Sequence, residues 1–581
     1  MSELSVREGA GVEQTTRRPF RPDTGSLGLW LMIALAALIV LPPVFILVKT
    51  SLSIETDTLE TSFGWDNFGS IVDIAGPKVW TDTLVFAAGS ALIGLVGGVS
   101  YAWLVARTNA YFRTLAQISA FLSLSIPVII KGIGWILLLG PNKGVLNEWL
   151  RALFGTSGVP IQLFGLGGMT FIEGILWIPL VFLLATPTLS LVNPALEEAA
   201  AMAGAKAPQI LLRVTLPIAM PGLLAILLLT LLRSLESFDI PLLIGLPGGT
   251  HTVTTEIYET LHVGFVPHYG EASAFGVLLI GLLVLPLLAY YRVTRNADRF
   301  ASITGKAFQM RRYDLGRWRL PAGLYLLLMP LSLLAPLAIL LWASFLPIYE
   351  SPSLSDFARM SLANYVTIFH LPLTVDGMWA SATVSSLSAT AVAAFTFLIA
   401  WIVVRSKQRP RYLLDFIGSL PLIIPGIVLG IAILEEFLAA DFVPIYGTIW
   451  IIVFAFLVRF MPYGIRCCHA GIIAIHRELE ESAATSGASP ATILRRIVLP
   501  LAMPAVAAIW IYVFLNSIRD LSLPIMLAGP KSRLISVVIL DRWQNGEVPQ
   551  LAALSVILAA TVSVLAWILM RLGQRYGAKS V

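Results

Sequence analysis

Charged side chains recur every three residues inside a long apolar stretch of the chain. Arg233, Glu236 and Asp239 lie within residues 218–245, a run that is otherwise almost entirely apolar. A continuous helix turns by about 100° per residue and would gather the three on one stripe. Charges within a membrane span are costly and usually functional, so the stripe predicts the lining of a translocation path. The alternative is a self-neutralising pair, Arg233 with Glu236, buried for packing.

A comparable stripe recurs later in the chain. Asn516, Arg519 and Asp520 lie in a second apolar stretch, and each stripe is followed by a proline, Pro241 or Pro524. Proline ends or bends a membrane helix, so the two stretches share a local design as well as a charge pattern. This arrangement suits a path that runs along the interface between two halves of the chain.

Two further charges, Lys131 and Glu173, stand singly near the ends of apolar stretches. Long charged side chains at such positions usually reach to the membrane surface while their stems stay in the apolar layer. We therefore expect both residues to snorkel rather than to line the path.

The chain contains an internal repeat. Residues 197–221 align without a gap with residues 480–504, at an offset of 283, and 14 of the 25 positions are identical. Each copy predicts a helix, a turn at Gly204 or Gly487, and a second helix that ends near a proline. Other alignable pairs have offsets between 294 and 298, so the first half carries about 11 extra residues within 141–167, which we expect to form a loop. These pairs are Asn67 with Asn364, Ala102-Trp103 with Ala400-Trp401, and residues 125–130 with 419–424.

The composition indicates a polytopic membrane protein. Hydrophobic residues make up 57% of the chain and charged residues only 13%, and the mean hydropathy is +0.83. A membrane helix needs about 20 mostly apolar residues, which predicts six spans in each half. The net charge of +5 is modest and indicates basic loops at the membrane rather than nucleic-acid binding. The expected spans are 27–48, 79–106, 115–140, 168–192, 218–245, 272–292, 321–346, 377–404, 412–438, 446–470, 501–528 and 549–571.

The basic residues predict the orientation of these spans. With the N-terminus inside, 28 of the 39 lysines and arginines fall in inside segments and 8 in outside segments, and Lys131, Arg233 and Arg519 fall within spans. Cytoplasmic loops are rich in lysine and arginine, so both termini and both copies of the repeat are expected in the cytoplasm. An even number of spans precedes the basic linker, so the halves form a parallel repeat.

The motifs of energy-converting and catalytic proteins are missing from the sequence. There is no Gly-x-x-x-x-Gly-Lys-Ser/Thr phosphate loop, and Gly305-Lys306 is followed by Ala307. There is also no Ser/His/Asp or Cys/His set in a catalytic context. We expect no enzyme activity, no catalytic residue, no cofactor and no metal site on this chain, and the driving energy must come from elsewhere.

The repeated pattern Glu-Ala-Ala, Gly and Ile/Val-x-Leu-Pro resembles the EAA loop of ABC-importer permeases. Copy two has Ser482 where that family usually has its first Ala. The resemblance covers nearly the whole chain and implies an all-α fold of two tandem six-helix permease domains, the type I importer fold. It implies the following division: a tail 1–26, a first domain 27–292 with its loop at 193–217, a linker 293–320, a second domain 321–571 with its loop at 476–500, and a tail 572–581.

The resemblance also implies partners. A permease of this kind sits in the bacterial inner membrane with two ATPase subunits that use ATP, receives substrate from a periplasmic binding protein, contacts lipid and binds no nucleic acid. The fused layout is most similar to Fe(III) permeases. Thiamine, polyamine and phosphonate permeases are alternatives, and an ion-gradient-driven secondary transporter is another. ATPase coupling is implied for Glu197, Glu198, Ala200, Gly204, Glu480, Glu481, Ala483 and Gly487.

The predicted outer loop 246–271 is rich in imidazole, carboxylate and phenol groups. Such ligands would suit a ferric ion, but a solvated loop that meets a binding protein needs the same residue types. The corresponding segment of the second half carries Lys531, Arg533, Asp541, Arg542 and Glu547 instead. The residues in question are His251, Glu256, Tyr258, Glu259, His262, His268, Tyr269 and Glu271.

Overall fold

The computed structural model describes residues 24–55, 61–155, 157–264, 266–295, 312–439 and 444–575. Most of the two predicted tails and of the linker lies outside the described residues. The described chain is almost entirely helical, apart from an antiparallel hairpin of β1 (Ser53–Glu55) and β2 (Thr61–Phe63), in which Ser53 pairs with Phe63. The all-α expectation is therefore confirmed.

The first half follows the predicted order of spans, with short helices between them. Its long α2 contains Gly76 at a positive φ of 54°, just before Pro77. The helices of this half are α1 (Thr24–Ser51), α2 (Asp66–Arg107), α3 (Arg113–Ser125), α4 (Val128–Leu139), α5 (Val145–Phe154), α6 (Leu166–Ser190), α7 (Pro194–Met202), α8 (Ala207–Ile210), η1 (Leu211–Thr215), α9 (Leu216–Leu235), η2 (Pro241–Gly245), η3 (Leu246–Gly248), α10 (Val253–His262) and α11 (Tyr269–Arg295).

The second half repeats this order. Each member of the first half except α5 and η3 has a helical counterpart among the described residues of the second. The helices of this half are η5 (Gly316–Trp318), α12 (Arg319–Leu326), α13 (Leu328–Phe345), η6 (Leu354–Arg359), α14 (Ala363–His370), α15 (Pro372–Arg405), α16 (Arg411–Ser419), η7 (Leu420–Ile423), α17 (Gly426–Ala439), α18 (Ile449–Ile473), α19 (Arg477–Thr485), α20 (Pro490–Ile493), η8 (Leu494–Val498), α21 (Leu499–Ser517), α22 (Pro524–Leu527), α23 (Ile535–Gln544) and α24 (Val548–Arg575).

Ten helices in the described residues are long and apolar enough to span a membrane, and the other two predicted spans are sharply bent pairs. α3 meets α4 at 111°, and the segment 411–423 meets α17 at 110°. The bends fall at Pro127 and Pro425, 298 residues apart, because the residue before a proline is driven out of the helical region. The alignment of residues 125–130 with 419–424 is therefore wrong by four residues.

The extra segment of the first half is helical rather than a loop. α5 occupies it, and Asn147 of α5 is fully buried, with its amide donating to the carbonyl of Leu139 at 2.7 Å. The corresponding described residues of the second half, 444–448, form no helix. The expectation of a loop was wrong because Pro141 and Gly144 in front of α5, and Gly155 behind it, suggested irregular structure throughout.

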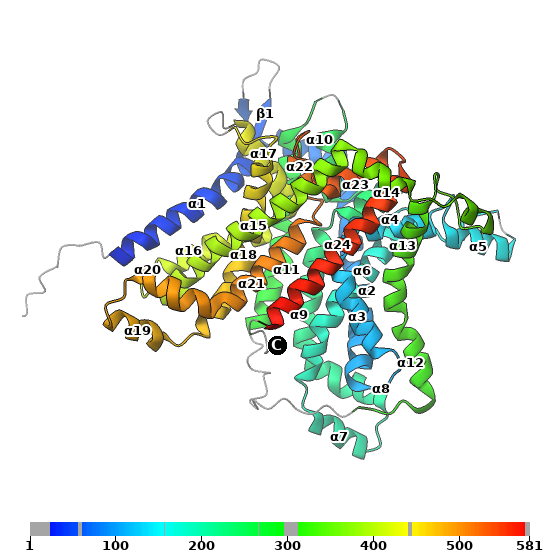
Figure 1. Cartoon of the computed structure of the whole chain (residues 1–581), viewed down its shortest axis with the longest axis horizontal. Helices are drawn as coiled ribbons and strands as arrows, with labels where there is room; N and C mark the ends of the chain where they lie inside the picture. Colours follow the sequence, from blue (N-terminus) through cyan, green and yellow to red (C-terminus); the bar gives the residue numbers. More distant parts are fainter. Residues whose placement is uncertain are drawn as a thin grey trace, which may run out of the picture.

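The first membrane helix of each half packs against the other half as well as against its own. α1 packs against α11 of its own half and against α16 and α17 of the second, and α13 packs against α24 and against α3 and α4 of the first. Figure 1 shows α1 leaning across α16 and α13 standing beside α4. A Cβ added to Gly134 of α4 would lie 2.6 Å from the Cβ of Pro336 in α13, so this crossing requires glycine. One apolar core accordingly runs through both halves.

The membrane helices that carry the charged stripes are broken. α9 ends at Leu235 and helical backbone resumes at Asp239, just before η2, while α21 ends at Ser517 and α22 begins at Pro524. The expected continuous helices over 218–245 and 501–528 are wrong in this respect. Irregular backbone at membrane depth is tolerated only where it is buried in protein or lines a cavity, and broken helices are typical of transporter binding sites.

Candidate translocation path and coupling loops

The first break gathers charges from both halves. Arg233 forms an ion pair with Glu236 at 3.2 Å, and its guanidinium also donates to the hydroxyl of Tyr463 on α18. The side chain of Arg233 is 29% exposed, so the pair is accessible as well as self-neutralising. The self-neutralising pair predicted from the sequence is therefore present, and the lining of a translocation path stays a prediction. The stripe geometry itself does not hold, because Glu236 and Asp239 lie beyond the end of α9.

The second break is organised by an arginine that the sequence reasoning missed. Arg459, in the middle of α18, pairs with Asp520 at 2.6 Å and donates to Ser522 at 3.2 Å. Arg519 donates to Asn516 at 2.6 Å. The positive-inside count includes Arg459 among the lysines and arginines of the inside segments, so the number in those segments falls by one. Its place within the predicted span 446–470 was the signal that could have identified it.

Lys131 and Glu173 do not snorkel. Each residue is only 4% exposed, and the ammonium of Lys131 donates to the carbonyl of Ser123 at 2.9 Å. The carboxylate of Glu173 interacts with Lys131 and with Ser237 in the first break. The expectation failed because the bend at Pro127 turns α4 inward. Both side chains therefore lie with the charged residues of the two breaks rather than at the membrane surface. We call this group of charged residues the charged centre.

The charged centre is formally neutral. Asp239 interacts electrostatically with Asp520, Arg459 and Arg519 of the second half, as well as with Glu173 of the first. The two breaks therefore form one polar region across the interface between the halves. Its members are the cations Lys131, Arg233, Arg459 and Arg519 and the carboxylates Glu173, Glu236, Asp239 and Asp520.

The two copies of the repeated loop have the same turn. Gly204 has a φ of +84° and Gly487 a φ of +86°. The amide of Ala205 donates to Ala200 at 3.0 Å and that of Ala488 donates to Ala483 at 3.0 Å. This is the Schellman arrangement, which needs a residue in the left-handed region after the helix. The glycines and the alanine carbonyls therefore end α7 and α19 at the same angle.

The first glutamate of copy one is held inside the protein. Glu197 is 2% exposed and pairs with the fully buried Arg107 at 3.2 Å. Arg107 also donates to the carbonyl of Leu189 at 2.8 Å, and Thr215 donates to Glu197 at 2.7 Å. The phenol of Tyr313, at the described end of the linker, donates to the same carboxylate at 3.3 Å. This set fixes α7 to the end of α2.

Copy two repeats the arginine pairing but not the threonine hydrogen bond, since Val498 stands at the position of Thr215. Arg405 pairs with Glu480 at 2.6 Å and donates to the carbonyls of Ile472 and Ile475 at 3.2 and 2.9 Å. The sequence reasoning missed these arginines. The signal was present, because Arg107 and Arg405 are 298 residues apart, the same offset as Ala102 and Ala400. Glu197 and Glu480 therefore hold the two loops against the ends of the membrane helices α2 and α15.

The second glutamates differ from the first. Glu198 is exposed, and the side chain of Glu481 is 65% exposed, with a pairing to Arg477 at 3.1 Å along α19. Figure 1 shows α7 and α19 at the lower end of the molecule, away from α10 and β1 at the upper end. The second glutamates are thus presented to solvent on projecting helices.

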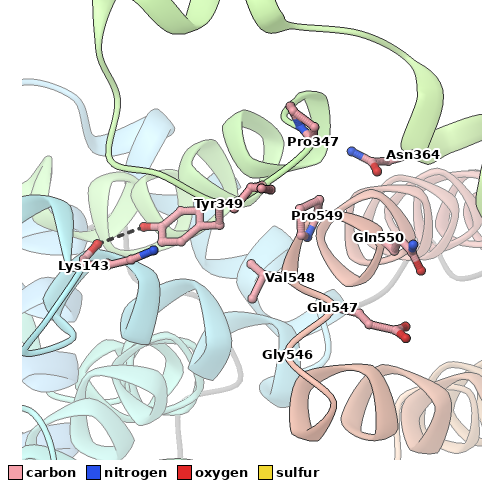
Figure 2. Close-up of a pocket in the computed structure, with 10 residues that line it drawn as sticks. Lys143, Pro347, Tyr349, Asn364, Gly546, Glu547, Val548, Pro549 and Gln550 are labelled. Carbon is pink, nitrogen blue, oxygen red and sulfur yellow. Dashed lines mark hydrogen bonds between the residues drawn. The ribbon is translucent and has the colours of Figure 1, made fainter.

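A cavity of about 370 Å³ lies at the upper end, away from the charged centre. Figure 2 shows its lining, in which Tyr349 of the second half points toward Lys143 of the first. The phenol donates to the carbonyls of Leu137 and Lys143 at 2.8 and 3.3 Å. Burial, reinforced by Glu148, raises the pKa of Tyr349 above its ordinary value, so the phenol stays a neutral donor. The cavity therefore lies between the two halves, and none of the eight charged residues of the charged centre lines it.

Comparison with known proteins identifies the class. Residues 90–297 and 393–579 each match the family described as the binding-protein-dependent transport system inner membrane component. The chain belongs to this family and carries its domain twice. It is therefore a permease of an ABC importer, a multi-pass membrane protein, and the predicted resemblance is confirmed.

The individual relatives include permeases named for ferric iron and for polyamines. The ferric transport system permease protein FbpB of Actinobacillus pleuropneumoniae is 26% identical over 81% of this chain and 67% of its own length. The Fe(3+)-transport system permease protein FbpB 2 of Haemophilus influenzae is 21% identical over 78% and 81%. The spermidine/putrescine permease PotC of Escherichia coli is 29% identical, but over 31% of this chain and 66% of its own. A solved alginate ABC transporter chain has a TM-score of 0.37 and 18% identity, over 44% of this chain and 96% of that one.

Proposed function

We propose that this permease carries Fe(III) across the inner membrane. The observation that carries the proposal is the extent of the ferric relatives, which match both halves of the chain, whereas the polyamine relative matches less than a third of it. Thiamine and phosphonate remain the other candidate substrates on the sequence pattern.

The charged centre supplies the path in this proposal. A bare trivalent ion would be repelled by four cations and attracted by four carboxylates, and neither effect dominates in a wet cavity. A ferric ion that travels with a bound anion meets both signs, since the carboxylates of Asp239 and Asp520 face the metal while Arg233 and Arg519 face the anion. The path residues are those predicted, Arg233, Glu236, Asp239, Asn516, Arg519 and Asp520, joined by Arg459, Lys131 and Glu173.

The two loops supply the coupling. Two ATPase subunits dock beneath the membrane, one on α7 and one on α19, through the exposed Glu198 and Glu481. Closure of the ATPases moves each short helix as a rigid body, because the ion pairs of Glu197 with Arg107 and of Glu480 with Arg405 tie it to the membrane helices. The path then alternates between a cytoplasmic opening and an opening toward a periplasmic binding protein.

This arrangement requires both termini and the linker in the cytoplasm, with permease domains at 27–292 and 321–571. The positive-inside count supports that orientation. The placement of α7 and α19 at one end of the molecule and α10 at the other also agrees with it.

Stimulation of ATP hydrolysis tests the substrate. The permease is reconstituted in proteoliposomes with its ATPase and binding protein. Ferric-loaded binding protein should stimulate hydrolysis several-fold, and binding protein offered thiamine, putrescine or a phosphonate should not. Stimulation by one of the organic ligands with none from iron would overturn the iron assignment and leave the permease class intact.

A further inference from the structure

Three ligand groups meet at the outer end of the charged centre. The Nδ1 atom of His251 lies 3.1 Å from a carboxylate oxygen of Glu256 and 2.8 Å from one of Glu259. One ligand atom from each residue lies within 4.8 Å of the other two. The side chain of His251 is 36% exposed, whereas that of Glu256 is only 12% exposed. The group is therefore a partly buried cluster rather than a fully exposed ion pair.

The spacing is that of ligands on a metal. Two donors at right angles on an octahedral cation, each about 2.1 Å from it, are about 3.0 Å apart. The two separations around Nδ1 have this length. Glu256 and Glu259 stand one turn apart on α10, so the helix presents both carboxylates on one side. His251 lies just before the start of α10 and faces them.

The second half provides a comparison, because different side chains occupy the positions that correspond to the cluster. The register between the halves here is 282 residues: the amide of Val253 donates to Thr83 at 3.0 Å, and that of Ile535 donates to Ser381 at 2.7 Å. This register pairs α10 with α23, residue by residue.

At that register the counterparts of the three ligands are an arginine, a valine and an aspartate. Arg533 stands for His251, and its guanidinium pairs with Asp541, the counterpart of Glu259, at 2.6 Å. Val538 stands for Glu256 and is fully buried. The second half thus fills the place with a fixed cation and one carboxylate. The first half has an imidazole and two carboxylates, whose ligand atoms lie close enough together to share one cation.

The cluster adjoins the path. The hydroxyl of Thr254 on α10 donates to the backbone carbonyl of Ser237 at 2.8 Å, within the first break. Ser237 lies between Glu236 and Asp239 of the charged centre. The helix that carries Glu256 and Glu259 is therefore joined by a hydrogen bond to the segment that carries Glu236 and Asp239, and Figure 1 places α10 at the end opposite α7 and α19.

We infer that His251, Glu256 and Glu259 form a binding site for a transition-metal cation at the outer entrance of the path. Three protein ligands leave coordination positions open for water or a co-delivered anion, which suits a cation in transit. That the transported cation is ferric iron rests on the proposed function; the metal site itself does not. This inference departs from the expectation of no metal site on the chain.

Equilibrium dialysis of the purified, metal-stripped full-length permease in detergent tests the site. The probes are ferric nitrilotriacetate, Mn(II) and Zn(II), and bound metal is counted per chain by mass spectrometry. We expect at least one of the three to bind at one ion per chain, and His251→Ala and Glu259→Gln each to weaken it at least tenfold. Glu350→Gln, which removes an exposed carboxylate paired with Arg359 and outside the cluster, is the control and should bind as the wild type does.

Two outcomes would overturn the inference: no probe binds the wild type, or His251→Ala and Glu259→Gln, eluting as folded protein, bind as well as wild type. Equal loss in Glu350→Gln would also overturn it, because the effect would not be local. The iron assignment fails separately. If Zn(II) or Mn(II) binds here while ferric-loaded binding protein does not stimulate ATP hydrolysis, the metal site stands and the iron function falls.

Discussion

Arg459 is the residue on which the charged centre depends most. It joins α18 to the second break through Asp520 and Ser522, and it lies within electrostatic range of Glu236 and Asp239 of the first half. Removing one partner of a largely buried ion pair leaves the other charge without compensation, which costs more than the pair itself contributes.

Arg459→Gln should therefore destabilise the protein and abolish transport. We expect a loss of about 2 kcal/mol, below the range for fully buried pairs because the arginine is partly exposed. The double variant Arg459→Gln with Asp520→Asn should recover thermal stability in detergent without recovering uptake. Glu350→Gln is the control, since its pair with Arg359 is exposed on both sides, at 46% and 42%. Wild-type stability and uptake in Arg459→Gln would contradict this role.

The positions of individual side chains were only partly predictable from the sequence. The stripe residues were found because charge is rare in apolar stretches. Lys131 and Glu173 were misplaced because their burial depends on the bend at Pro127 and on packing against distant helices. Arg107 and Arg405 were missed because arginine at the end of a span has an ordinary role at the membrane surface, and only the matching offset marks them as a pair.

At the scale of elements, the coupling loops were predicted most fully. The repeat identified the helix and the glycine turn, which the structure has in both copies. The signal was strong because the Schellman turn leaves a glycine that the sequence displays directly. The expected end of the second helix near Pro217 or Pro500 was wrong, because that helix runs on into the membrane spans Ala207–Leu235 and Pro490–Ser517. The breaks after α9 and α21 were not predicted. Their sequences favour helix almost to the proline, and a tertiary hydrogen bond from Thr254 holds the first break open.

Gly204→Val and Gly487→Val should uncouple transport from ATP. A β-branched residue at positive φ is strained by roughly 1–2 kcal/mol, and an added Cβ would meet no atom within 4 Å at either glycine. The effect therefore arises from the backbone and alters the angle between α7 or α19 and the next helix. We expect the double variant to insert normally but to lose co-purification with the ATPase and substrate-stimulated hydrolysis.

Gly204→Asn and Gly487→Asn provide the matched control. Asparagine visits the left-handed region more readily than other non-glycine residues, so these variants should keep most of the coupling. If the valine and asparagine pairs behave alike, the turn geometry has no part in coupling.

The whole molecule is two interlocked copies of one unit. α1 and α13 each pack against the opposite half, so the halves share one core and cannot move apart as independent bodies. The number and order of spans were predictable from hydropathy and the repeat. The exchange of first helices was not, because both faces of α1 are apolar and nothing local specifies which half it contacts.

Reporter fusions test the orientation of the whole molecule. A reporter inserted at Gly264, just after α10, should report the periplasmic side, and one inserted at Thr304 in the linker should report the cytoplasm. The reason is the concentration of lysine and arginine in the linker and tails. Reports from the same side at both positions would contradict the twelve-span arrangement.

Uptake measured directly is the sharpest test of the central claim, that this chain forms an ATP-coupled ferric path. Proteoliposomes contain the permease and its ATPase, with ATP sealed inside. Binding protein loaded with radioactive ferric iron is added outside, and the iron that enters is counted. The account predicts accumulation that requires ATP and is lost in Arg459→Gln and in the Gly204→Val/Gly487→Val variant. Accumulation that persists without ATPase, driven by a proton or sodium gradient, would contradict it.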